Sequence, residues 1–328
     1  MTASRLFQRS GPLILLAVLL VLLSLFVPDF LGLRNLRGLM LSVTLVGTIA
    51  ATMMLVLAMR EVDLSVGSTV ALAGVLTAVV IGATGSVALG VLAGLAGGTL
   101  VGLFNGVVIA GLKVNSLIVT LATMEMVRGL AFLVSGGESV AIPAEAFYAL
   151  GSGSFLGINW PIWVMLLSFV VFGLVVNRTV FGRNILAIGG NPEAARLAGV
   201  PVTRVRVMVF ALQGLAAAVA GIVLAARITS GQPNTSMGLE LAVISACVLG
   251  GVSLSGGVAT IGGVIVGVLI MGAAQNALNL LNVPTFYQYL VRGGILLVAV
   301  IADRLRQGGR LPTFRRRPAA APNETSHA

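Results

Sequence analysis

Three residue types with versatile side-chain chemistry are almost absent from this chain of 328 residues. There is one lysine, Lys113, one histidine, His327, and one cysteine, Cys247. A single histidine and a single cysteine exclude a histidine-based metal site, a Ser-His-Asp triad and an intrachain disulfide. We therefore expect no metal, no cofactor and no catalytic residues, and thus a protein that is not an enzyme.

Charged residues are also scarce, at 9% of the chain against 58% hydrophobic residues, and the mean hydropathy is +1.07. This composition excludes a soluble nucleotide-binding domain. Apolar runs long enough to span a bilayer recur along nearly the whole chain, and each must be a helix because only a helix pairs all its backbone groups internally. We expect an all-α polytopic membrane protein with about ten transmembrane helices.

The predicted spans alternate with short polar segments. They are residues 12–27, 39–59, 65–83, 86–111, 116–135, 161–176, 207–226, 239–252, 257–280 and 286–302, of which 239–252 is expected to be short and broken. They make up a transmembrane region, 12–303, preceded by a cytoplasmic segment, 1–11, and interrupted by a long cytoplasmic loop, 177–206. The basic tail, 304–328, is predicted to be cytoplasmic and disordered.

Basic residues number 20 against 10 acidic ones, which gives a net charge of +10. Two arginines fall within spans, three fall in expected outer segments, and the other fifteen fall in expected cytoplasmic segments. This asymmetry places both termini in the cytoplasm. Because the cations are scattered, they indicate contact with anionic lipid rather than nucleic acid. The three outer residues, which contact either lipid headgroups or a docking partner, are Arg34, Arg37 and Arg227.

The long cytoplasmic loop is predicted to contain a helix of about two turns. Asn191 can cap it, Pro192 suits its first position and Glu193 lies in its first turn. Gly199 can end it. Small side chains would let another protein approach closely, and they are Ala194, Ala195 and Ala198. The segment is either a plain connector or a docking helix for a cytoplasmic partner.

Four of the polar residues at or within predicted spans are candidates for a pathway or a gate: Asp63, Ser65, Glu125 and Arg128. Asp63 can cap the helix that follows it, so this helix is expected to begin at the membrane boundary or inside it. Alternatively, Asp63 and Ser65 line a pathway, because broken helices are a device of transporters. Glu125 and Arg128 lie three apart on one helical face, where an unpaired charge costs several kcal/mol. We expect them to pair with each other or with a neighbouring helix, as a structural ion pair or a gate.

Two glycine patterns need separate interpretations. Residues 250–257, GGVSLSGG, contain the LSGG of ABC-type ATPases, but the chain has no G-x-x-x-x-G-K-[ST] phosphate loop. We therefore predict no ATP site in this chain. Gly90, Gly94 and Gly98 are spaced four apart, which predicts close helix packing.

Several stretches in fixed order resemble the permease subunits of bacterial ABC importers for monosaccharides, the ribose, xylose and arabinose group. They are DLSVGS (63–68), FGRNILAIGGNPEAARLAGV (181–200), LGGVSLSGG with IGGVIVG (249–267) and NLLNVPTFYQYLVRGGILLVAVIAD (279–303). Within that group, LATMEMVRGLAFLVSGG (121–137) and the segment 226–257 look most similar to the members for L-arabinose. Where many members have a small pair before DLSVG, this chain has Arg60 and Glu61.

The resemblance implies the ribose-permease fold, in a bacterial inner membrane, with L-arabinose as the solute and another pentose, a hexose or a related small solute as the alternative. It implies three partners: a second permease copy, an ABC ATPase subunit that hydrolyses the ATP, and a periplasmic sugar-binding protein that Arg34, Arg37 and Arg227 would receive. It also implies that a short helix in the cytoplasmic loop couples the permease to the ATPase. The residues of this coupling helix are Asn191, Glu193, Ala194, Ala195, Arg196 and Gly199.

Two other classes of protein fit less well. An ion-coupled secondary transporter needs functional acids inside the membrane and has no use for a coupling helix. A membrane enzyme needs metal ligands or bases that this sequence lacks.

Overall fold

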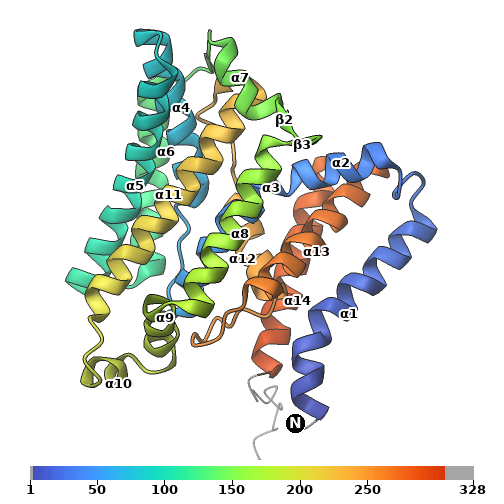
Figure 1. The fold of residues 1–328 in the computed structure, drawn as a ribbon, viewed down its shortest axis with the longest axis vertical. Coiled ribbons are helices and arrows are strands. Elements are labelled where there is room, and N and C mark those ends of the chain that lie inside the picture. Colours follow the sequence, from blue (N-terminus) through green and yellow to red (C-terminus); the bar gives the residue numbers. More distant parts are fainter. Residues whose placement is uncertain (1–2, 307–328) are drawn as a thin grey trace, which may run out of the picture.

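The computed structural model describes residues 3–306, and they form a bundle of helices with two very small sheets (Figure 1). The predicted tail lies almost wholly outside the described residues. Seven helices in this range are long and apolar enough to cross a bilayer. They are α4 (Val66–Thr84), α5 (Val87–Leu112), α6 (Ser116–Ser135), α8 (Trp160–Arg178), α11 (Val202–Ile228), α13 (Ile261–Leu280) and α14 (Thr285–Arg306). The chain is a multi-pass membrane protein.

Three further apolar units complete the bundle. The first is α1 (Ala3–Phe26), and the second is a bent pair, α2 (Leu33–Ser42) with α3 (Thr44–Ala58), whose axes differ by 42°. The prediction had one straight span over 39–59. The bend lies at Val43, where the hydroxyls of Ser42 and Thr44 donate to carbonyls three residues back. Such local bonds compete with regular helix and often bend it. The third unit is α12 (Leu239–Leu249).

Two helices begin inside the bundle after non-helical backbone, one of them α4 and the other α12. Residues 61–64 lead up to α4, and residues 229–238 lead from α11 to α12 (Figure 1). At about 1.5 Å per residue, the 11 residues of α12 cover only about half of a bilayer core. The expectation of a short span broken before GGVSLSGG is confirmed, and that stretch forms the turn between α12 and α13.

The segment between the predicted spans 207–226 and 239–252 was expected to lie outside, and this is wrong for most of its length. A Cβ on Gly231 would meet Gly74 and Ala78 of α4, and Ser236 lies against Gly67 at the start of α4. The segment therefore runs along α4 into the bundle. The segment has the hydrophilic composition of a loop, but its polar groups make contacts inside the protein.

The two ends of the bundle differ. One end carries α7 (Glu145–Ser152), the hairpin of β2 (Ser154–Phe155) with β3 (Ile158–Asn159), and β1 (Val140–Ala141) paired antiparallel with β4 (Ser230–Gly231). The other end carries α9 (Val180–Gly190) and α10 (Pro192–Leu197), as well as the start of α1 and the end of α14 (Figure 1). Between the ends, α3 is buried from Gly47 to Ala58 and forms the centre of the core.

Glycines allow the closest helix contacts. A Cβ on Gly94 would lie 2.9 Å from the carbonyl oxygen of Ala73 in α4, and one on Gly98 would lie 2.8 Å from that of Gly214 in α11. The close packing predicted for Gly90, Gly94 and Gly98 is confirmed. The contact continues at Gly102, whose Cβ would lie 2.2 Å from the carbonyl oxygen of Phe210.

A leucine at this contact should destabilise the bundle. Gly102→Leu places carbon where the α11 backbone lies, and overpacking of this kind costs about 1–3 kcal/mol. Gly111→Leu is the control, since a Cβ at Gly111 of the same helix meets nothing within 4 Å. We expect a lower yield of monodisperse protein in detergent and a lower apparent Tm for Gly102→Leu only. Equal behaviour of the two variants would contradict the packing argument.

Candidate functional site

The extended backbone before α4 is held by a buried polar network. Asp63 accepts hydrogen bonds from the amide of Ser65 at 2.9 Å and from its hydroxyl at 2.6 Å, and Asn105 of α5 donates to the same hydroxyl at 2.9 Å. All three residues are buried. Asp63 was predicted to be the N-cap, but Ser65 occupies that position and α4 begins at Val66. The difference arises because residues 61–64 remain extended, which places Asp63 before the cap.

The starts of α4 and α12 touch at Gly67. A Cβ there would lie 2.6 Å from the carbonyl oxygen of Ser236 and 2.7 Å from a carboxylate oxygen of Glu240, so only glycine fits. Both helices bring the positive end of their dipole to this point, which favours a nearby carboxylate. Glu240 lies in the first turn of α12, and Asp63 lies just before α4. We call this meeting point the junction: Asp63, Ser65, Gly67, Ser236 and Glu240.

Arg128 holds the segment before α12 against α6. One of its terminal nitrogens donates to the carbonyl oxygen of Pro233 at 2.6 Å and to that of Thr235 at 2.8 Å. Within the described residues it forms no direct ion pair with Glu125, so the first of the two expected partners is wrong. The partner is instead the backbone of the segment that leads into α12. Glu125 is exposed at the surface of the single chain, halfway along α6.

Arg60 and Glu61 connect the segment before α4 to the end of the bundle that carries α10. At these two positions the sequence departs from the pattern of the resembled family. Arg60 donates to the carbonyl oxygen of Gly190 at 2.7 Å, and Glu61 forms an ion pair with Arg206 of α11 at 3.2 Å. The amide of Gly257 donates to the carbonyl oxygen of Ala58 at 2.8 Å. The end of α3, the end of α9 and the α12–α13 turn therefore meet at one place.

Several buried polar atoms near these helices have no hydrogen-bond partner in the described part of the chain. They are Ser68 Oγ, Asn105 Oδ1, Ser236 Oγ and both side-chain polar atoms of Gln213. A buried polar atom without a partner costs free energy, so native proteins keep such atoms where water or a solute can reach them. Sequence reasoning missed Asn105, Gln213 and Glu240, because nothing local shows that their side chains face the interior of the bundle rather than its surface.

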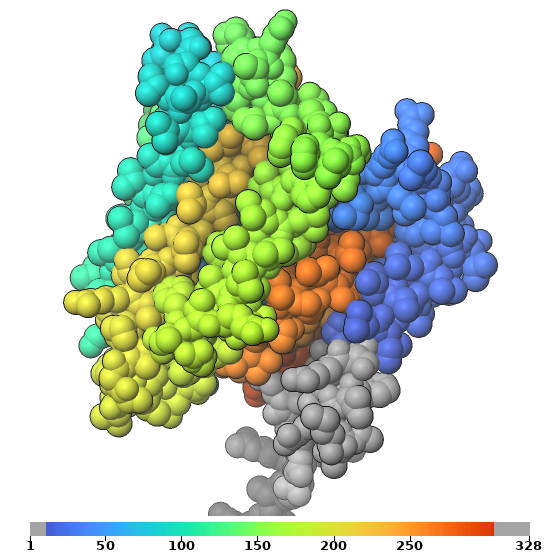
Figure 2. All heavy atoms as spheres, in the orientation of Figure 1, coloured from blue at the N-terminus to red at the C-terminus, as the bar shows by residue number. Residues whose placement is uncertain are grey.

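The predicted short helix exists as α10. The side chain of Asn191 accepts hydrogen bonds from the amides of Glu193 and Ala194 at 3.0 and 3.1 Å, Pro192 is the first residue, and Gly199 has φ +83°. Glu193 and Arg196 form an exposed ion pair at 3.3 Å. Figure 2 shows the region from α9 to the start of α11 as one corner of the molecule.

The exposed side of α10 differs from the prediction. Ala195 is only 5% exposed and packs into the core cluster of its own chain, so it cannot offer its surface to a partner. Ala194 and Gly199 are exposed, and between them Leu197 is 84% exposed. Sequence reasoning missed Leu197, which is a large apolar side chain at the end of the bundle where hydrophobic exposure is not explained by lipid.

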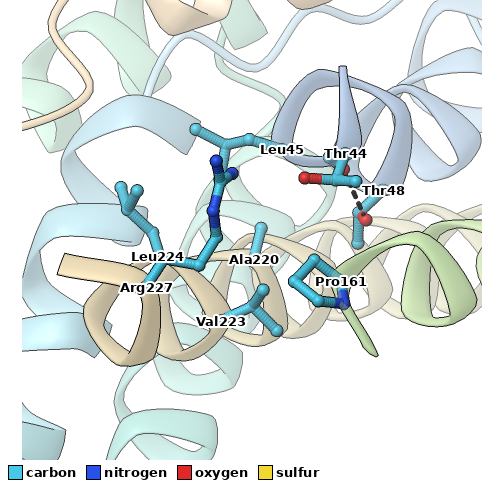
Figure 3. A pocket seen from close by; sticks show the side chains of 8 residues that line it. All are labelled: Thr44, Leu45, Thr48, Pro161, Ala220, Val223, Leu224 and Arg227. Atoms are coloured by element: carbon cyan, nitrogen blue, oxygen red, sulfur yellow. Dashed lines mark hydrogen bonds between the residues drawn. The ribbon is translucent and has the colours of Figure 1, made fainter. Parts of the chain in front are cut away.

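The three outer arginines lie at the end opposite to α10. Arg34 and Arg37 are exposed on α2, which was expected to be a loop. Arg227 ends α11 and donates to the carbonyl oxygen of Leu41 at 3.1 Å. Figure 3 shows its side chain rising from α11 toward α3, beside a small cleft. The cleft is lined by Thr44, Leu45, Thr48, Pro161, Ala220, Val223, Leu224 and Arg227.

Within residues 3–306, no three histidine, cysteine, aspartate or glutamate side chains lie together as they would in a metal site. The described residues form a membrane bundle in which the starts of α4 and α12 meet at a polar junction. A family profile described as the permease component of the branched-chain amino acid transport system matches residues 35–300. The chain belongs to this permease family. Membership makes it a transport subunit, as the resemblance implied.

Curated relatives of this permease cover nearly its whole length. It is 61% identical to the L-arabinose ABC transporter permease protein AraH of Azospirillum brasilense over 93% of this chain and 90% of that one. It is 54% identical to the L-arabinose transport system permease protein AraH of Escherichia coli K12, over 92% of both chains. The ribose import permease protein RbsC of Bacillus subtilis is 42% identical over 90% of this chain and 93% of that one. No solved structure matches the permease.

Removing the Arg128 side chain should loosen the start of α12. Arg128→Ala removes two bonds from a charged donor, each worth about 1.5–3 kcal/mol. We expect amide hydrogen exchange in residues 234–242 to become at least about tenfold faster. Arg183→Ala, at an exposed site on α9, is the control and should leave these amides unchanged. Unchanged exchange in Arg128→Ala would show that this side chain does not hold the segment.

Proposed function

We propose that this chain is the membrane-spanning permease of an ATP-driven importer for L-arabinose in a bacterial inner membrane. The observation that carries the proposal is the 61% identity, over 93% of the chain, to a permease named for L-arabinose transport. The junction supports it, since transporters bind solutes where helix N-termini meet inside the membrane. The more distant similarity to a ribose permease makes another pentose, a hexose or a related small solute the alternative.

The proposed topology has ten crossings and both termini in the cytoplasm. Seven long helices, one bent pair and two shorter apolar helices correspond in number and order to the ten predicted segments. The start of α1 and the end of α14 lie at the same end as α10, as an even number of crossings requires (Figure 1). Basic residues concentrate at this end, which supports a cytoplasmic location.

In this proposal, α10 is the coupling helix that seats on a separate ABC ATPase subunit. Its capping by Asn191 and its ion pair between Glu193 and Arg196 make it a defined short helix. The contact surface would be Ala194, Leu197 and Gly199 rather than the buried Ala195. Leu197 would fill a pocket of the ATPase, since a buried apolar anchor is typical of a tight interface.

At the other end, Arg34, Arg37 and Arg227 would receive a periplasmic sugar-binding protein by charge complementarity. A second copy of the permease would complete the path, because the carboxylate of Glu125 would otherwise face lipid at mid-membrane depth, where a charge is costly. Asp63 and Ser65 would then act as a gate behind the path, and Arg128 would hold the adjoining segment.

Transport by the purified complex tests the proposed function. The permease is reconstituted in liposomes with the ABC ATPase and the sugar-binding protein encoded beside it. We expect ATP-dependent uptake of labelled L-arabinose that exceeds uptake of D-ribose, D-galactose and L-leucine. Uptake of L-arabinose driven by an ion gradient without ATP, or preferred uptake of L-leucine, would contradict the proposal.

A charge on the exposed apolar side chain of α10 should prevent ATPase binding. Leu197→Asp should abolish copurification of the ATPase while the permease keeps its yield and its monodispersity. Leu156→Asp is the matched control, because Leu156 is 78% exposed at the opposite end, in the β2–β3 turn. Ala195→Leu should instead lower the yield of folded permease. Normal ATPase binding by Leu197→Asp would exclude Leu197 from the coupling contact.

A further inference from the structure

Four helices lie side by side around the junction and form one face of the protomer. α6 packs on α4, α4 touches α12, and α12 packs on α14. In Figure 1 this face lies behind α8 and α11. It carries ionisable side chains at membrane depth: Glu125 and Arg128 from α6, Glu240 from α12 and Arg292 from α14.

These four groups are close without being neutralised by direct contact. Glu240 interacts electrostatically with both Arg128 and Arg292, and Arg128 interacts with Glu125 as well. None of these pairs approaches within 4.0 Å in the described part of the chain. Arg292 lies with its guanidinium 5.6 Å from the centre of the Tyr289 ring. Charged side chains in direct ion pairs use their hydrogen-bond donors and acceptors on each other, whereas separated side chains keep donors and acceptors available for a ligand.

We propose that Glu125, Glu240 and Arg292 form a binding station for a neutral polyol, with Arg128 and the remaining residues of the junction as its supporting wall. On this face, the carboxylates of Glu125 and Glu240 and the guanidiniums of Arg128 and Arg292 sum to no net charge, so neither an anion nor a cation is favoured. A sugar hydroxyl donates to a carboxylate and accepts from a guanidinium, and one pentose can satisfy both kinds of group. Charged partners give the stronger hydrogen bonds.

Two further observations point to a polar ligand at this place. Among the described residues, Ser236 of the junction and Ser68 beside it have hydroxyls without a hydrogen-bond partner, although both oxygens are buried. Glu125 is exposed at the middle of α6, and this carboxylate requires water or polar cover. A hydrated path between two copies of the chain, with one station contributed by each copy, satisfies both. The inference rests on the proposed function and adds the residues that contact the sugar.

Neutral variants of the two carboxylates test the station. Glu125→Gln and Glu240→Gln keep the shape of the side chain but lose the charge-assisted bond, so each should lower L-arabinose uptake at a fixed sugar concentration about tenfold. The liposome assay above is used, with ATPase copurification as the check on assembly. Glu138→Gln is the matched control, since Glu138 is exposed just beyond α6. It should transport normally.

Thiol accessibility gives a second measurement that does not need transport. Cys247 is buried, so a new cysteine can be labelled selectively. Glu125→Cys, or Leu121→Cys one turn before it on the same exposed face, should react with a membrane-impermeant methanethiosulfonate in liposomes. Val170→Cys is the control, because Val170 is exposed at mid-depth on α8, on another side of the bundle. It should stay unlabelled.

The outcomes separate the two levels of inference. If the unmodified permease imports L-arabinose but both glutamine variants transport normally, the station is wrong and the proposed function stands. Absence of labelling at both 121 and 125 also overturns the station. If the unmodified complex imports no sugar at all, the proposed function fails, whereas labelling at 121 or 125 would still mark this face as hydrated.

Discussion

Every backbone polar group at membrane depth needs a partner inside the protein, since lipid offers none. Non-helical segments lead into α4 and into α12, and the surrounding side chains supply partners for their backbone groups. Ser116 of α6 accepts from the amide of Val62 at 3.1 Å, and Arg128 of the same helix donates to Pro233 and Thr235. Side chains of α6 therefore hold both segments in place, and the polar junction between α4 and α12 depends on them.

Glycine allows the helices around the junction to approach one another closely. At Gly67 the carbonyl of Ser236 and the carboxylate of Glu240 occupy the space of a side chain, and at Gly102 the backbone of α11 does the same. A bundle of larger residues would separate these helices and leave the extended segments without partners. The many glycines thus serve the polar interior as much as the packing of apolar surfaces.

Local features of the sequence predicted local structure well. Asn191, Pro192 and Gly199 specify α10 through capping and turn geometry that involve only near neighbours, and the spacing of Gly90, Gly94 and Gly98 needs only a helix to take effect. Features that depend on distant segments were missed. Ala195 was assigned to the partner surface because the sequence does not state which side of α10 faces its own chain. The residues just before Glu240 were assigned to an outer loop because a polar segment that enters the bundle has the same composition as one that stays outside.

The pairing of β1 with β4 consists of two residue pairs, Val140 with Gly231 and Ala141 with Ser230. It joins the outer segment after α6 to the strand that continues directly into the segment before α12. A displacement of the segment after α6 is therefore passed along the backbone between β4 and α12 to the first turn of α12, without passing through any long helix. The end of the bundle that carries α7 and the orientation of Glu240 in the interior are thus mechanically linked through these two residue pairs.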